Sequence, residues 1–201
     1  MNSPITIYTV GHSTHTTEKF LDLLERNGVT AIADVRSSPF SRHNPQFNKD
    51  TLSGELKKHG IAYVFVGNEL GARSEDPACY TDGKVRYDRL AQTSIFKAGI
   101  DRVLSGAQRY RIALMCAERD PIDCHRALLV GRALAGVGVE VEHILADGAT
   151  EGHTALERRL LDAAGRGEGG DLFATPAELL ALAYLRQEKR AGLIDEEQAK
   201  P

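Results

Sequence analysis

Five short segments rich in β-branched and aromatic residues alternate along the chain with segments whose apolar residues recur at helical spacing. In the first helical segment, for example, Phe20, Leu23 and Leu24 share one face, and Gly28 follows as a stop signal. Such alternation joins parallel strands through right-handed helical crossovers, and it predicts an α/β fold with a mainly parallel five-stranded sheet and helices on both faces, in three layers. The expected strands are 5–10, 30–35, 61–66, 111–116 and 137–145.

The region after the fifth strand predicts a helical extension. A further helix is expected over 153–164, after which four glycines crowd positions 165–170. Thr175, Pro176 and Glu178 then fit the N-cap, first-turn and third positions of a capping box that opens a last helix. We therefore expect a single α/β domain over 1–164, followed over 165–201 by a flexible glycine-rich hinge and a C-terminal helix.

Charge and hydropathy exclude several classes of protein. The 201 residues carry a formal net charge of −3 and a pI near 6.2, which argues against a protein coated in nucleic acid but allows a local basic patch. Apolar runs such as 112–116 are far shorter than the roughly 20 residues that cross a bilayer. The first ten residues lack the pattern of a secretory signal, and three cysteines do not suit a disulfide framework. We expect a cytoplasmic protein without membrane contact; the sequence leaves its oligomeric state open.

Three groups of polar residues follow three of the predicted strands. Because ligands of parallel sheets bind at the carboxyl ends of the strands, we expect these groups to meet in one pocket. Each group also has a purely structural interpretation, such as a tight turn, a helix cap or a salt bridge. The groups are Gly11, His12 and Ser13 after the first strand, Asp34 and Arg36 after the second, and Cys116, Glu118, Cys124, His125 and Arg126 after the fourth.

The loop over 37–49 is basic and contains no acidic residue. Arg42 and Lys49 offer contacts to phosphate, and Phe40 and Phe47 offer surfaces on which a base or sugar can stack. An ordinary solvated loop is the alternative interpretation.

The group after the fourth strand carries the strongest chemical signal. We expect Asp120 or Asp123 to cap a helix whose first turn contains residues 124–126. A thiol at a helix N-terminus near His and Arg is favoured as the nucleophilic thiolate, although a capping carboxylate opposes this effect. Cys116 lies in an apolar run and also fits a small core residue.

The joint order of these motifs resembles the bacterial and archaeal family called domain of unknown function 488. The resemblance covers about 5–161 and implies a cytoplasmic α/β domain whose motif residues gather at one site; it implies no particular reaction. One departure is that Ala72 stands where family members often have a second glycine after Gly71. The motifs are 9–13, 34–36, Pro39 with Ser41, Leu70 with Gly71, 114–118 and 124–126.

Two hypotheses about function involve a ligand at the strand ends. The first is a cysteine-dependent transferase or hydrolase for a small anionic or nucleotide-like substrate, with Cys116 or Cys124 as nucleophile and His125 or His12 as base. The second is a non-catalytic module that binds nucleotides or nucleic acid. The candidate ligand-binding residues are Gly11, Ser13, Asp34, Arg36, Ser41, Arg42, Glu118 and Arg126.

A metal site is the third hypothesis. Its ligands would come from Cys116, Cys124, His125, His12 and His153. We expect no metal ligands, because the adjacent Cys124 and His125 should point apart at a helix start and lack the usual paired spacing. No cofactor is expected.

Overall fold

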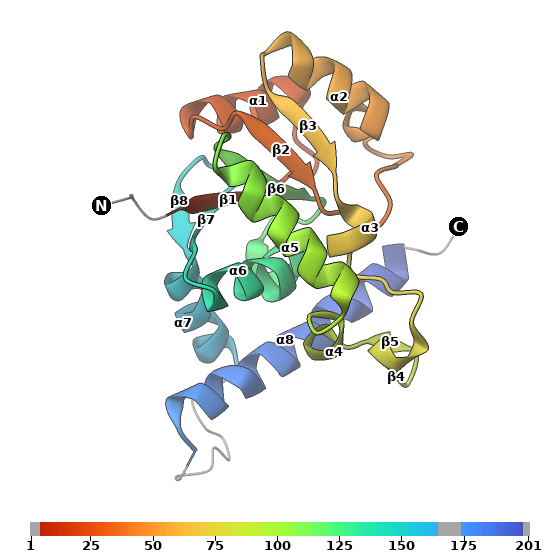
Figure 1. The fold of residues 1–201 in the computed structure, drawn as a ribbon, viewed down its shortest axis with the longest axis vertical. Coiled ribbons are helices and arrows are strands. Elements are labelled where there is room, and N and C mark those ends of the chain that lie inside the picture. The colour runs from red at the N-terminus through yellow and green to blue at the C-terminus, as the bar shows by residue number, and fades with distance from the viewer. Residues whose placement is uncertain (1–4, 165–173, 199–201) are drawn as a thin grey trace.

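A computed structural model describes residues 5–164 and 174–198, and the predicted glycine hinge at 165–170 lies outside the described residues. The chain builds a six-stranded sheet in the order β3-β2-β6-β1-β7-β8, as Figure 1 shows. Neighbouring strands are parallel except β7 and β8, which are antiparallel. The strands are β1 (Thr6–Gly11), β2 (Ala31–Asp34), β3 (Ala62–Phe65), β6 (Ile112–Cys116), β7 (Glu140–Ile144) and β8 (Thr150–Gly152).

The predicted α/β class with a mainly parallel sheet is confirmed, and the predicted count of five strands is wrong by one. The missed strand is β8, whose sequence is Thr-Glu-Gly. It is too short to show an alternating pattern, and it pairs at the sheet edge by backbone hydrogen bonds to β7 that any sequence can make.

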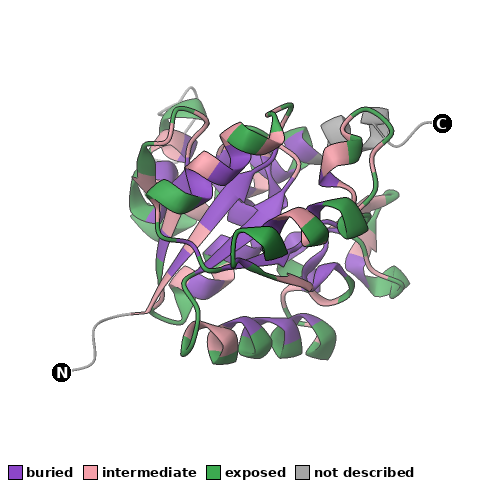
Figure 2. Ribbon diagram, turned by 90° about the horizontal axis from the view of Figure 1, so that it is seen from above, coloured by how far each residue is buried: buried purple, intermediate pink, exposed green. Residues whose placement is uncertain are grey.

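Helices cover both faces of the sheet. Alternate residues of each strand point to opposite faces and pack into two different hydrophobic clusters, one under each layer of helices. Ile32 and Met115 pack under the helices α1 and α2, whereas Ala33 and Leu114 pack under the helices that follow later in the chain. Figure 2 shows the buried sheet between these layers. The helices are α1 (Thr17–Arg26), α2 (Lys49–Lys58), α5 (Ser94–Ala107), α6 (Arg132–Gly136), α7 (His153–Ala163) and α8 (Pro176–Gln198).

The segment over 67–87, which the sequence predicts as a long loop, contains several short helices and strands. The capping box predicted for the last helix is confirmed. Glu178 N donates to Thr175 Oγ1, and the Glu178 carboxylate accepts from Thr175 N at 2.7 Å. None of the helices in the described residues is both long and apolar enough to span a membrane. The short elements that begin within 67–87 are α3 (Gly67–Leu70), η2 (Pro77–Cys79), β4 (Tyr80–Thr81), β5 (Lys84–Val85) and α4 (Tyr87–Leu90); another short element, η1 (Pro45–Phe47), lies in the loop before α2.

The strand order places the three polar groups at neighbouring strand ends. β6 lies between β1 and β2, so that Gly11 pairs with Cys116 and Asp34 pairs with Met115. The carboxyl ends of these parallel strands therefore deliver the motif residues to one edge of the sheet.

Candidate functional site

The turn after β6 is not the regular helix start that the sequence predicts. Asp120, and not Asp123, caps a short 3-10 turn, η3 (Pro121–Asp123), by accepting a hydrogen bond from Ile122 N at 3.0 Å. Cys124 then has extended backbone angles (φ −132°, ψ 137°), and a π-helical segment, η4 (Arg126–Gly131), follows. Cys124 therefore occupies the N-cap position and not the first turn: its carbonyl oxygen accepts from Leu128 N at 3.0 Å, and Arg126 N donates to its Sγ at 3.4 Å, so the helix N-terminus still favours its thiolate.

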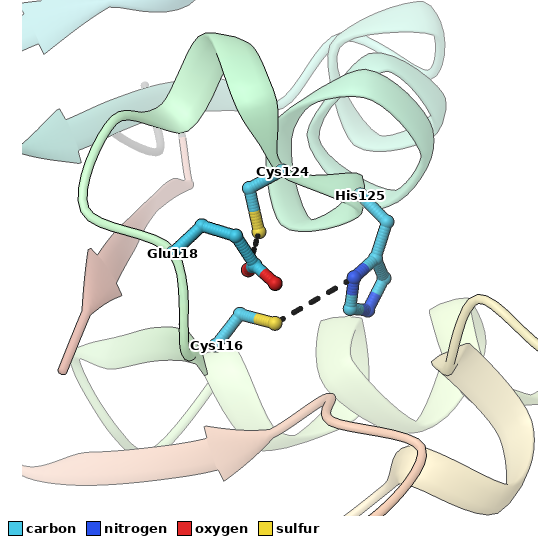
Figure 3. A group of neighbouring side chains, drawn as sticks. All are labelled: Cys116, Glu118, Cys124 and His125. Carbon is cyan, nitrogen blue, oxygen red and sulfur yellow. Dashed lines mark hydrogen bonds between the residues drawn. The ribbon is translucent and has the colours of Figure 1, made fainter. Parts of the chain in front are cut away.

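The extended residue between η3 and η4 brings four side chains together. We call this group the thiol cluster: Cys116, Glu118, Cys124 and His125. Their ligand atoms all lie within 4.8 Å of one another. Figure 3 shows the four side chains pointing toward one another. The expectation that Cys124 and His125 point apart is wrong, because the change from an extended to a helical residue turns both side chains inward. Glu118 is half-buried, and the other three residues are buried.

Hydrogen bonds orient the members of the thiol cluster. Cys124 Sγ lies 2.7 Å from a Glu118 carboxylate oxygen, and Cys116 Sγ lies 3.6 Å from His125 Nδ1. His125 Nε2 lies 2.9 Å from the carbonyl oxygen of Val35, at the end of β2. A carbonyl only accepts, so His125 Nε2 carries a proton and Nδ1 faces the thiol of Cys116.

The two thiols differ in their preference for ionisation. Burial raises the pKa of Cys116 well above its usual value. Burial opposes ionisation of Cys124 too, but hydrogen bonding to Cys116 and the charge of Arg126 lower its pKa well below the usual value. Burial likewise opposes a charged His125, yet its interactions with Cys124 raise its pKa to about 9. Burial, followed by the charge of Cys124, raises the pKa of Glu118. The negative charge of the cluster therefore resides mainly on Cys124.

Arg126 directly follows His125 of the thiol cluster in the chain and is fully buried. Its guanidinium group donates to the carbonyl oxygens of Glu118 at 2.7 Å and Arg119 at 3.2 Å, and its backbone N donates to Cys124 Sγ at 3.4 Å. It forms no ion pair with any residue that the structure describes. A buried guanidinium without a carboxylate partner requires a nearby negative charge, and the thiol cluster supplies it.

Gly11 permits the close contact between β1 and the turn that carries Glu118. A Cβ atom at this position would overlap the carbonyl oxygen of Glu118 and would approach the Arg126 guanidinium. We expect Gly11→Ala to lower the free energy of unfolding by at least about 1–3 kcal/mol, because the overlap is with backbone that cannot rotate away. Urea unfolding followed by circular dichroism measures the change.

Gly54→Ala is the matched control for this substitution. Gly54 lies inside α2, with nothing within 4 Å of the added atom, so alanine there should stabilise the protein by up to about 1 kcal/mol. Equal effects of the two substitutions would contradict the steric argument.

The residues that follow β1 and β2 form a second cluster on the α1 and α2 side of the sheet. Arg36 donates to both Asp34 carboxylate oxygens, at 2.9 Å and 2.7 Å, and also to the carbonyl oxygen of Phe47. His12 stacks on Phe47, donates from Nδ1 to the Ser13 carbonyl oxygen, and accepts from Arg36 at Nε2. Burial, then the charge of Arg36, lowers the pKa of His12 to about 4. Both ring nitrogens of His12 therefore have protein partners.

The remaining predicted site residues lie around these clusters. Ser13 adopts a left-handed conformation (φ 47°) and donates from its backbone N to the Ala117 carbonyl oxygen, while Thr16 caps α1. The Ser41 hydroxyl accepts from Asn44 N inside its own loop, and Arg42 is exposed. The polar groups thus meet at one sheet edge but divide into two clusters, which the hydrogen bond from His125 to Val35 connects.

The sequence singled out each member of the thiol cluster but missed two of its supports. Tyr63 donates to Asp34 at 2.7 Å across from β3, and the Val35 carbonyl oxygen orients His125. Tyr63 lies in an ordinary strand pattern and Val35 acts through its backbone, so neither carried a signal in the sequence.

Comparison with known proteins gives a family for this chain. No curated protein and no solved structure matches it. The family model described as domain of unknown function DUF488 matches residues 16–133, which is more than half of the chain and includes the thiol cluster. This match confirms the resemblance noted in the sequence, and the chain belongs to the DUF488 family.

Proposed function

We propose that the protein binds a metal ion, with zinc as the ion that suits the site best, through Cys116, Glu118, Cys124 and His125. The observation that carries this proposal is the convergence of four ligand atoms within 4.8 Å of one another. Two thiolates, an imidazole and a carboxylate form a donor set that zinc accepts, and four donors complete its tetrahedral shell.

The orientation of His125 supports the proposal. A histidine that binds metal through one ring nitrogen almost always donates from the other to a carbonyl or carboxylate, which fixes the ring. His125 donates from Nε2 to Val35, so Nδ1 is directed toward Cys116.

The charge balance also supports the proposal. Two thiolates and one carboxylate around a divalent cation leave a single negative charge, and the buried Arg126 guanidinium carries the opposite charge. The loaded site is then neutral as a whole, which suits a buried position. The backbone hydrogen bond from Arg126 to Cys124 Sγ favours the thiolate as a ligand.

The proposal is tested by the metal content of the purified protein. Elemental analysis by mass spectrometry should find about one zinc ion per chain in protein expressed with added zinc. Cys116→Ser and Cys124→Ser should each reduce the zinc content at least tenfold. Cys79→Ser is the matched control, because Cys79 is equally buried but lies in η2, outside the cluster. Circular dichroism shows whether each variant is folded.

Cobalt titration of metal-free protein gives a second readout. Two thiolate ligands produce a sulfur-to-cobalt charge-transfer absorption, and each cysteine variant should lose part of it. Metal-free protein that takes up neither ion, with a circular dichroism spectrum typical of a folded protein, would overturn the proposal.

A cysteine-dependent enzyme is the second candidate, and the lowered pKa of Cys124 favours it. In that case the Cys124 thiolate forms a bond to an electrophilic atom of a small anionic or nucleotide-like substrate, the bond to the leaving group breaks, and His125 or Glu118 gives the leaving group its proton; water (hydrolase) or a second substrate (transferase) then displaces Cys124. Iodoacetamide should then label Cys124 at a lower pH than Cys79, and to the same extent before and after treatment with a chelator. Labelling of Cys124 only after zinc is removed would favour the metal centre instead.

A further inference from the structure

A chain of buried hydrogen bonds crosses from the sheet to the C-terminal helix, and we call it the relay: Thr9, His143, His153, Tyr184 and Glu157. Thr9 Oγ1 lies 2.8 Å from His143 Nδ1, and His143 Nε2 lies 3.1 Å from His153 Nδ1. His153 Nε2 lies 3.0 Å from the Tyr184 hydroxyl, which donates to Glu157 at 3.0 Å. The relay includes none of the four residues of the thiol cluster, and it links β1, β7, α7 and α8.

The outer end of the relay fixes where each proton lies. The only hydrogen of the Tyr184 hydroxyl goes to Glu157, so the hydroxyl must accept from His153 Nε2. His153 Nδ1 then accepts from His143 Nε2, and His143 Nδ1 accepts from the Thr9 hydroxyl. Every contact is satisfied when both imidazoles are neutral and carry their proton on Nε2.

A proton added to either histidine breaks this arrangement of donors and acceptors. A second proton on His153 puts an N–H on Nδ1, opposite the N–H of His143 at 3.1 Å. His143 can respond only by moving its own proton to Nδ1, which takes away the acceptor of the buried Thr9 hydroxyl. Charging both rings places two cations in contact within the core.

The charged groups around the two rings also oppose protonation. Burial, followed by the charge of His153, lowers the His143 pKa to about 2; the charges of Arg126 and Arg159 add to that effect, and Asp120 opposes it. Burial lowers the pKa of His153 too, with Arg132 adding to that effect and Glu157 opposing it.

The α8 helix depends on polar contacts for its position beside α7 (Figure 1). The buried residues of its described part are Ala183, Tyr184, Gln187, Glu188 and Ala191, and Tyr184 is the only large apolar surface among them. Gln187 donates to Asp123 at 2.7 Å, and Glu188 accepts from Tyr87 N at 2.9 Å. Leu180 is partly buried against the core and Arg132 lies over the Tyr184 ring, so the described side chains of α8 make a small apolar contact beside their hydrogen bonds, and loss of those hydrogen bonds weakens the attachment.

We propose that His143 and His153 form a pH-sensitive latch that holds α8 on the domain at neutral pH and releases it on acidification. The docked form binds fewer protons than the released form, in which a histidine has its ordinary pKa near 6.5. Docking is therefore fully stable above pH 6.5 and weakens as the pH falls below that value. Because Gln187 donates to Asp123, release of α8 also removes one hydrogen bond from the turn that precedes Cys124, which Arg159 of α7 continues to hold at Asp120.

Hydrogen exchange of the full-length protein tests the latch. Opening of α8 over 176–191 should increase about tenfold between pH 7.5 and pH 5.5 for each histidine that titrates, after correction for intrinsic exchange rates. Amides of β6 should keep their protection. His153→Gln retains a donor toward Tyr184 but does not titrate, so it should reduce the pH dependence, and His143→Gln should do the same.

Two controls isolate the histidine effect. His59→Gln changes an exposed histidine outside the relay and should behave like the wild type. Burial raises the pKa of Glu188, so its protonation favours docking in acid, and a parallel series with Glu188→Gln removes that contribution. Opening of α8 that is independent of pH, that is matched by β6, or that is unchanged in both relay variants would overturn the proposal.

Discussion

Zinc should raise the free energy of unfolding by about 4 kcal/mol at a free concentration about a thousandfold above its dissociation constant. The four donor atoms converge only in the folded chain, where Cys116 comes from β6 and Cys124 and His125 from the turn after η3. An ion that binds the folded state alone stabilises it in proportion to the logarithm of the ion concentration. Thermal and urea unfolding at a series of buffered zinc concentrations measure this dependence.

Cys124→Ser provides the control, because it removes one ligand and should abolish the dependence on zinc concentration. Cys79→Ser should retain the full dependence, since Cys79 lies outside the thiol cluster. A wild-type midpoint that stays constant over several decades of free zinc would contradict specific binding by the folded state.

Asp34→Ala should lower the free energy of unfolding by about 3–5 kcal/mol, the usual effect of leaving one partner of a buried ion pair alone. Asp34 is fully buried, and Arg36 is 5% exposed. The substitution leaves the Arg36 guanidinium without its carboxylate and deprives the Tyr63 hydroxyl of its acceptor. Urea unfolding measures the loss, and an unchanged dependence on urea concentration would show that the compactness of the folded state is retained.

The double substitution Asp34→Ala with Arg36→Met should recover most of that loss, because no charge then remains unpaired. Asp22→Ala removes a carboxylate from an exposed pair with Arg26 on α1 and should leave the urea midpoint almost unchanged. If Asp34→Ala were as mild as Asp22→Ala, the buried pair would not support the sheet edge.

The sequence predicts the layout of this fold well because the pattern that specifies parallel strands is local. Each central strand is a short apolar run, and each was found within a few residues of its position in the sheet. The strand β8 was not predicted because an edge strand of three residues is defined by pairing with β7 and not by its side chains. The elements within 67–87 were not predicted because each is only two to four residues long, too short to show a pattern in the sequence.

The composition of the candidate site could be predicted from the sequence, but its geometry could not. Strand ends identified Cys116 and Glu118, and unusual polarity identified Cys124 and His125. Their convergence depends on a change of backbone conformation at Cys124, which no spacing rule for regular helices describes. The relay was missed because His143 fits the alternation of β7, and its connection to Tyr184 exists only in the folded chain.

The position of β6 has a consequence for the order in which the protein can assemble. Strands β1 and β2 are consecutive in the chain, yet the sheet separates them, and β6 fills the gap by pairing Tyr8 with Ala113 and Ile32 with Ala113 from either side. Until synthesis reaches that strand, both edges of β1 and one edge of β2 lack their partners, and the first half of the chain cannot close its core. Such distant pairing is slow to form, so these strand edges stay open to pairing with other chains until β6 is inserted. Cys116 ends this same strand, so the thiol cluster cannot form at the sheet edge before β6 is inserted.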